Sequence, residues 1–260
     1  MSTTDIGWTG LVASLTLVVV ALALSWWQGL RLERSILWAS TRAGAQLLVV
    51  GWALVLVLDP DTPTAVAWLW VVVMVFVAAL TIRQRASEVP GAFGIGLAAI
   101  STVAVVSLGV IFGFGIFPMK AQAIVPLAGM MVGNSMAATV LSARRIVAEL
   151  DDKRLDVEAR LALGLPSREA AKPHVRVALR TALTPQIEST KAVGLIALPG
   201  AMTGLILAGV DPVNAVQVQL AVMYLILGSV ATSVTVVGLG LARRLFTPDH
   251  RLVRLSEAAR

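Results

Sequence analysis

The sequence contains no cysteine and only two histidines among its 260 residues. Without cysteine, the chain cannot form a disulfide framework, a thiolate zinc site or a cysteine nucleophile. His174 and His250 both lie in charged segments, so a histidine-rich metal site or a haem site is unsupported. The chain also lacks the G-x-x-x-x-G-K-[ST] pattern, which excludes ATP hydrolysis by a P-loop of its own.

Charged residues are scarce. They make up 14% of the chain, hydrophobic residues make up 57%, and the mean hydropathy is +0.85. A soluble domain usually carries about 25% charged residues and at most about half apolar ones. The composition therefore disfavours a soluble globular enzyme, excludes a disordered chain and predicts an all-α polytopic membrane protein.

Long apolar runs predict about seven transmembrane helices. The first run has no basic segment before it, so we interpret it as a span and not as a signal peptide. The predicted spans are Trp8–Trp27, Ile36–Leu58, Thr64–Ile82, Phe93–Phe114, Ala121–Ala143, Ala192–Ala208 and Pro212–Leu241.

Basic residues are concentrated in alternate connections: those after the first, third and fifth spans, and the C-terminal tail. The positive-inside rule then predicts an outer N-terminus and an inner C-terminus. Residues 143–180 and 242–260 each carry a net charge of +3, which accounts for the formal charge of +6. We expect attraction of these two segments to anionic lipid of the inner leaflet.

The connection after the fifth span is the only sizeable polar stretch. Leu155, Ala159 and Ala162 can share one face of a short helix. The Gly164-Leu165-Pro166 sequence then predicts a turn, and Ser167 can cap a second short helix. This segment is too short for a nucleotide-binding domain.

Glu158-Ala159-Arg160, followed by Gly164, is similar to the E-A-A-x-x-x-G loop of bacterial ABC-transporter permeases. In that family the loop forms a coupling helix that docks in a groove of a separate ATPase subunit. Residues 182–187, Ala-Leu-Thr-Pro-Gln-Ile, are loosely similar to the rest of the motif. The residues that this resemblance assigns to coupling are Glu158, Ala159, Gly164, Pro166 and Ser167.

Longer stretches resemble the Fet-type iron-export permease family, an uncharacterised membrane family whose plant relatives are linked to aluminium tolerance. The matching residues are Pro126 to Met136, Thr190 to Gly204, Ala208 to Ala215 with Gln217 and Gln219, and Ile36 to Trp38 with Arg42 and Gln46. The similarity covers nearly the whole chain in order. One departure is Ala201, where the family pattern leads us to expect a methionine.

The resemblance implies one transmembrane permease domain over residues 1–260, with a cytoplasmic coupling segment at about 144–190 and a basic tail at 242–260. It further implies two permease copies, two separate ABC ATPase subunits and a place in the bacterial inner membrane, in contact with lipid and not with nucleic acid. This chain would bind no cofactor of its own, since ATP and Mg would be held by the ATPase. Iron export is the activity that the resemblance implies.

Glycine pairs in the fifth and sixth spans are spaced so that both members share a helix face, which allows close approach of helix backbones in lipid. Either packing within one subunit or a dimer interface along a substrate path would use them. The four residues are Gly129, Gly133, Gly200 and Gly204.

Polar residues and methionines in the spans have two readings. Asn134 and Ser135 either form interhelical hydrogen bonds or line a translocation path. Methionines fill cores or act as soft ligands, which fit soft metals better than iron(III). The candidate path residues are Gln46, Met130, Asn134, Ser135, Pro199, Met202, Thr203 and Gln217.

The Leu198-Pro199-Gly200 sequence interrupts the sixth span, as a static kink or as a hinge with exposed carbonyls. Glu188 and Lys191, three residues apart, either form a local ion pair or relay motion to that interruption.

Other functions stay open. An ABC permease for a different cargo, such as a sugar nucleotide, shares every feature above. A carrier driven by an ion gradient is less favoured, because no Asp or Glu lies deep in a predicted span. A membrane scaffold that recruits a partner is the third alternative. The sequence has no His-carboxylate cluster that would identify iron, and the metal ligands are unknown.

Overall fold

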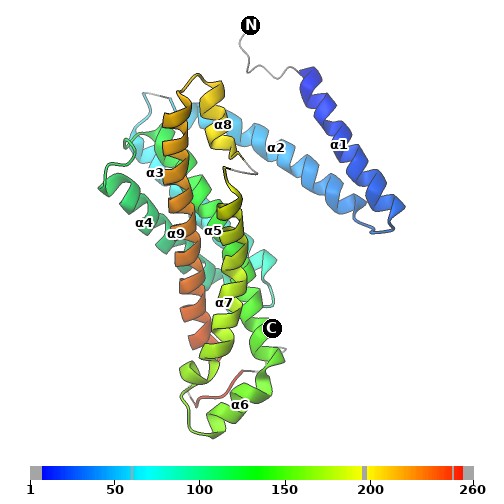
Figure 1. Ribbon diagram of the computed structural model, residues 1–260, viewed down its shortest axis with the longest axis vertical. Helices are drawn as coiled ribbons and strands as arrows, with labels where there is room; N and C mark the ends of the chain where they lie inside the picture. The colour runs from blue at the N-terminus through cyan, green and yellow to red at the C-terminus, as the bar shows by residue number, and fades with distance from the viewer. Residues whose placement is uncertain (1–7, 60, 195–197, 248, 254–260) are drawn as a thin grey trace. The chain divides into compact units, whose positions relative to one another are not determined.

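The computed structural model describes residues 8–59, 61–194, 198–247 and 249–253, which form nine α-helices and their connections (Figure 1). Over these residues the all-α prediction is confirmed. The chain divides into two compact units, residues 1–63 with 207–209 and residues 64–206 with 210–260. The assignment of the whole chain to one permease domain stays a prediction.

The first unit is a helical hairpin of α1 (Trp8–Trp27) and α2 (Glu33–Val57). Ser25 joins the two helices: its Oγ donates to Glu33 Oε1 at 2.9 Å and accepts from the backbone N–H of Leu32 at 3.1 Å. Most described side chains of both helices are exposed. Apolar helices with so little protein around them are suited to contact with lipid.

The second unit is a helical bundle. It contains α3 (Thr64–Arg85), α4 (Ala92–Gly113), α5 (Ala121–Asp152), α7 (Ser167–Ala192) and α9 (Pro212–Arg244). The central helix α5 packs against the other four, and α9 packs against α4, α5 and α7. Figure 1 shows α5, α7 and α9 side by side over most of their length.

Glycines bring helices of this bundle into close contact. A Cβ atom at Gly96 of α4 would lie 3.0 Å from Ile82 of α3, and one at Gly238 of α9 would lie 2.9 Å from Leu179 of α7. Small residues at such contacts increase the van der Waals packing that holds helices together in lipid. These glycines differ from the pairs that the sequence pattern singled out.

Within the described residues, five helices are long and apolar enough to cross a bilayer: α2, α3, α4, α5 and α9. The first predicted span has the bounds of α1, but its described apolar part, Val12–Trp27, is shorter. The second to fifth and the seventh predicted spans each fall on one of the five. The total of seven spans and the orientation stay predictions.

The sixth predicted span, Ala192–Ala208, is not one continuous helix over its described residues, in agreement with the interruption predicted at Leu198-Pro199-Gly200. α7 ends at Ala192, and α8 (Gly200–Leu207) has only eight residues. At 1.5 Å per residue α8 is about 12 Å long, against about 30 Å of hydrocarbon. The backbone at Gly194 has φ 89°, and Pro199 has no N–H to donate, so neither position continues a helix. Residues 195–197 of the expected span lie outside the described residues.

α7 is also longer than expected. The predicted second short helix runs for 26 residues, because neither Pro173 nor Pro185 ends it. Its buried side chains include Ala178 and Ala182. The polar segment predicted to lie in the cytoplasm thus supplies a full-length member of the bundle.

One end of the bundle has its own apolar core, and we call this end the base. α5 has 32 residues, about 48 Å, so it extends well past about 30 Å of hydrocarbon. The base comprises the end of α5, the short helix α6 (Arg154–Ala162), the first turns of α7 and residues 245–253. Its buried residues include Ile146, Leu150, Val157, Ala170, Ala171, Leu245, Phe246 and Leu252.

The predicted basic tail is in part folded into this base. α9 continues to Arg244, and beyond it Leu245 and Leu252 are 0% and 5% exposed. An antiparallel bridge between Phe246 and Leu252 closes the segment into a narrow loop. The described part of the tail is therefore a structural element of the base, and its attraction to anionic lipid stays a prediction.

Candidate coupling site

α6 lies across the base with one side buried and the other exposed. Val157 is fully buried in the core of the base, whereas Leu155 is 82% exposed. Ala159 and Ala162 are exposed as well. The sequence correctly grouped Leu155 with these two alanines, and the structure shows that this face is uncovered by the described chain.

The turn after α6 is built by Gly164. Its φ of 86° is left-handed, its N–H donates to the carbonyl of Leu161, and the N–H of Leu165 donates to the carbonyl of Arg160. This pair of hydrogen bonds, with glycine between them, is a Schellman C-cap. The turn also leaves Leu163 83% exposed. The predicted break at Gly164 is confirmed.

Ser167 does not cap α7, contrary to the prediction. Pro166 occupies the N-cap position with an extended backbone, and Ser167 is already the first helical residue. The Ser167 side chain is 8% exposed, and its hydroxyl forms a hydrogen bond with Nδ1 of His250. The hydroxyl therefore ties the start of α7 to the C-terminal loop.

Charged residues brace α6. Arg154 pairs with Glu158 at 2.7 Å, and Arg160 pairs with Asp156 at 3.1 Å, both across one helical turn. Arg154 also donates from Nη2 to the backbone carbonyl of Leu252 at 3.0 Å. The helix is thus held to the C-terminal loop as well as to itself.

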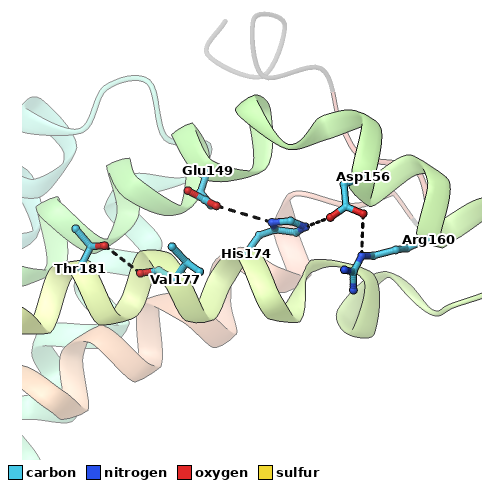
Figure 2. A network of polar contacts seen from close by, with 6 residues as sticks. All are labelled: Glu149, Asp156, Arg160, His174, Val177 and Thr181. Atoms are coloured by element: carbon cyan, nitrogen blue, oxygen red, sulfur yellow. Dashed lines mark hydrogen bonds and ion pairs between the residues drawn. The ribbon is translucent and has the colours of Figure 1, made fainter.

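His174 of α7 lies between two carboxylates from different helices (Figure 2). Its Nε2 is 3.0 Å from Asp156 of α6, and its Nδ1 is 3.8 Å from Glu149 of α5. The hydrogen bond from Arg160, with further attraction from Arg160 and His174, outweighs burial and lowers the pKa of Asp156. This buried histidine links three helices of the base, and its role could not be found from its isolated place in a charged segment.

Most of the residues assigned to coupling lie on the exposed surface of the base. Glu158, Ala159, Gly164 and Pro166 are exposed. Ser167 faces inward instead. The carboxylate of Glu158 is engaged by Arg154, so it is held in place but remains accessible.

The candidate path residues of α5 face different surroundings. Asn134 of α5 is exposed and donates from Nδ2 to the carbonyl of Met130 on its own helix, at 2.8 Å. A cavity of about 160 Å³ lies beside Asn134 and is also lined by Gln186 of α7. Gln186 was not expected beside Asn134, because it falls within the segment 144–190 that was predicted to be cytoplasmic.

Ser135, the next residue of α5, points in a different direction from Asn134 and is fully buried. Its hydroxyl, like that of Thr139 one turn later, has no hydrogen-bond partner among the described residues. Nearby along the same helix, Met131 accepts a hydrogen bond on its Sδ from Ser229 of α9 at 3.1 Å, and Ser229 also pairs with Ser107 of α4 at 2.6 Å. Small hydroxyl side chains of α4, α5 and α9 are therefore buried in the bundle core.

The remaining path residues lie on α2, α8 and α9 and in the connection before α8. Gln46 is exposed on α2 of the first unit, and Gln217 is exposed near the start of α9, where Gln219 is buried. Thr203 donates from its hydroxyl to the carbonyl of Pro199 at 3.0 Å. Met202, next to it, is 8% exposed.

The predicted glycine pairs make few contacts. Within the described chain, a Cβ at Gly133, Gly200 or Gly204 would meet no atom within 4 Å, and one at Gly129 would meet only Met74, at 3.8 Å. Close packing inside one subunit therefore does not require them. The Glu188–Lys191 ion pair, in contrast, forms at 2.9 Å.

Among the described residues no group of three or more His, Cys, Asp or Glu side chains is arranged to hold a metal ion. The base does carry an exposed apolar surface, which consists of the α6 face with Leu155 and the turn with Leu163. We call this surface the tip.

Comparison with known proteins gives a consistent result. Residues 8–246 match the family described as "Uncharacterised protein family (UPF0014)". The chain is 39% identical over 222 residues to "UPF0014 membrane protein STAR2" of Oryza sativa subsp. japonica, covering 85% of this chain and 78% of the relative. It is 32% identical over 243 residues to "Probable iron export permease protein FetB" of Escherichia coli K12, covering 94% and 93%.

A third relative is "Protein ALUMINUM SENSITIVE 3" of Arabidopsis thaliana, which is 34% identical over 222 residues, 85% of this chain and 81% of the relative. No solved structure matches the chain.

Proposed function

We propose that this chain, which belongs to the uncharacterised membrane-protein family UPF0014, is the membrane subunit of an ABC-type exporter driven by a separate ATPase. The observation that carries the proposal is the exposed apolar tip on a braced base. Leu155 and Leu163 stand more than four-fifths exposed on the part of the chain that is richest in charge. An apolar patch rimmed by charge, outside the lipid-facing surface, is typical of a protein-binding site.

The base is suited to passing on a force. α6 is fixed to α7 through His174 and Asp156, and to α5 through the core around Val157. α5 and α7 continue from the base along the bundle, so a displacement of α6 would move both helices as levers. Proteins respond to such displacements by switching between packed arrangements, because their cores are not continuously deformable.

The proposed topology puts the base in the cytoplasm, where an ATPase would meet it. The same end of the bundle carries Arg83, Arg85, Arg243 and Arg244, in agreement with the positive-inside rule. The bacterial relative supports a place in the bacterial inner membrane. Two copies of the chain would pair with two ATPases, which would hold ATP and Mg.

Iron is the proposed cargo because the bacterial relative is named as an iron export permease. The side chains that could contact this cargo are suggested by their residue types alone. Asn134 and Gln186 offer amide oxygens, and Met130 offers a thioether. A divalent metal with some of its water retained fits such neutral oxygen ligands better than a dehydrated trivalent ion.

The test is reconstitution of the full chain with ABC ATPases of its source genome, beginning with any encoded beside it. The double variant Leu155→Glu/Leu163→Glu is expected to weaken ATPase association by about tenfold or more, because it introduces charge into the apolar contact. Leu155→Met/Leu163→Met is the matched control and is expected to retain association. ATP-driven Fe²⁺ transport by proteoliposomes then tests the cargo.

The outcomes separate the two parts of the proposal. Full association of the Glu variant would contradict the assignment of the tip. Normal association and ATP hydrolysis without Fe²⁺ movement would contradict iron as the cargo and leave the coupling role intact. Transport by the chain without ATPase and ATP would favour a carrier driven by an ion gradient.

A further inference from the structure

α7 and α9 enclose a groove of about 400 Å³ on the flank of the bundle, which begins at the first turns of α7 in the base. The α7 wall carries Arg168, Lys172 and Arg176, which are four residues apart and so follow one helix face. Glu169 also lines the groove, leaving two net positive charges. None of the proposed coupling contacts involves this wall.

The three basic side chains are available to a ligand. All three are exposed, and none forms an ion pair within the part of the chain that the structure describes. Two other basic residues near the base are engaged: Arg144 pairs with Glu88, and Arg154 with Glu158. In the groove, by contrast, three cations without an ion pair among the described residues follow one helix face.

The α9 wall is mostly apolar, with Thr235 as its one polar lining residue among those described. Leu239 is 50% exposed, and Gly238 and Ala242 flank it. Leu179 of α7 extends the apolar lining on the side away from Arg168. These are the last apolar turns of α9 before Arg243 and Arg244. The groove therefore changes from basic to apolar along the bundle axis, as the lipid–water boundary does.

We propose that this groove binds one anionic phospholipid. The phosphate would contact Lys172 and Arg176, and an acyl chain would lie along Leu239 and Leu179. Basic pockets between helices on the inner side of a membrane are suited to such head groups, because each Lys or Arg near the surface adds to the attraction of anionic lipid. This inference rests on the membrane location and orientation of the bundle, and not on the ATPase partner or the cargo.

Native mass spectrometry of the delipidated full chain tests the site with phosphatidylglycerol and phosphatidylcholine as probes. Wild type is expected to retain phosphatidylglycerol preferentially. The triple variant Arg168→Gln/Lys172→Gln/Arg176→Gln is expected to lose about tenfold or more of that retention. Arg83→Gln/Arg85→Gln/Lys153→Gln removes the same charge from exposed positions outside the groove and is expected to change retention less than about twofold.

Two further arms test the acyl part. Leu239→Trp fills the apolar half and is expected to reduce retention while the thermal stability stays unchanged, because the side chain is half exposed. Glycerol phosphate, which has no acyl chain, is expected not to compete. Equal losses in both triple variants would show diffuse attraction and overturn the site. Competition by glycerol phosphate would show a phosphate site without an acyl slot and would also overturn it.

Discussion

The two ends of α7 differ in what holds them. At its start, Ser167 and His174 contact the C-terminal loop and two neighbouring helices, and Ala170 and Ala171 are fully buried. Near its end, the described ion pair is between Glu188 and Lys191 of α7 itself, with side chains 61% and 67% exposed. One end is fixed to several elements, whereas the other is fixed mainly to itself.

A helix that is fixed at one end and loosely held at the other is suited to act as a lever. A rigid attachment at the base would carry a push from the proposed ATPase into α7, and the break after Ala192 would let the far end follow. Exposed local ion pairs stabilise by only about 0.3–0.5 kcal/mol, so the Glu188–Lys191 pair would offer little resistance. The Leu198-Pro199-Gly200 sequence then acts as a hinge in this scheme, and not as a static kink.

The largest expected effect comes from Val157, the buried residue of α6. Val157→Asp would bury a carboxylate in the core of the base, at a cost of several kcal/mol. We expect a marked drop in the melting temperature of the detergent-solubilised chain, together with loss of coupling.

Leu155→Asp on the same helix is the matched comparison. Its side chain is 82% exposed, so the melting temperature should change little while ATPase association is weakened. Equal destabilisation by both variants would mean that the two faces of α6 are not distinct.

A smaller effect is expected from the link between α7 and the C-terminal loop. Ser167→Ala removes a nearly buried hydroxyl whose partner is His250, and should lower the free energy of unfolding by about 1 kcal/mol. Thr184→Ala is the control, because that hydroxyl bonds only within its own helix, to the carbonyl of Arg180. A loss in the control as large as that in Ser167→Ala would contradict a role for the C-terminal loop in fixing α7.

The smallest expected effect depends on pH. The pKa of Asp156 is lowered, chiefly by the hydrogen bond from Arg160, so the folded chain favours the charged carboxylate. The resulting stability is present above the ordinary pKa of an aspartate, about 3.9, and is lost as the pH falls through the lower folded value.

Asp156→Asn removes this titration. Its melting temperature should fall less than that of wild type between about pH 5 and pH 3. A parallel decline of the two proteins would show that Asp156 does not contribute to the acid sensitivity of the base.

Much of the fold follows from local patterns, and the exceptions have physical causes. The lengths of the apolar runs were enough to predict α2 to α5 and α9. Gly164 was enough to predict the turn after α6, since a left-handed backbone favours glycine. The polarity of α7 concealed its place in the bundle. Its buried face is made of small residues such as Ala178 and Ala182, which hydropathy weighs too lightly.

The site was predictable where it is local and not where it joins distant segments. Glu158, Ala159 and Gly164 belong to one short motif. Ser167 was misassigned because its partner, His250, lies 83 residues further along the chain. The contacts of His174 likewise join α5, α6 and α7, and a single sequence does not reveal such pairings.

The absence of cysteine allows the most direct test of coupling through the tip. Leu163→Cys, carrying a thiol-linked photocrosslinker, can be assembled with the ATPase and irradiated. Met119→Cys is the control: it is 57% exposed on the connection between α4 and α5, at the other end of the bundle. If the tip contacts the ATPase, Leu163→Cys should give a cross-linked product with the ATPase and Met119→Cys should give none. A product from Met119→Cys alone, in a complex that still assembles, would contradict docking of the ATPase on the tip.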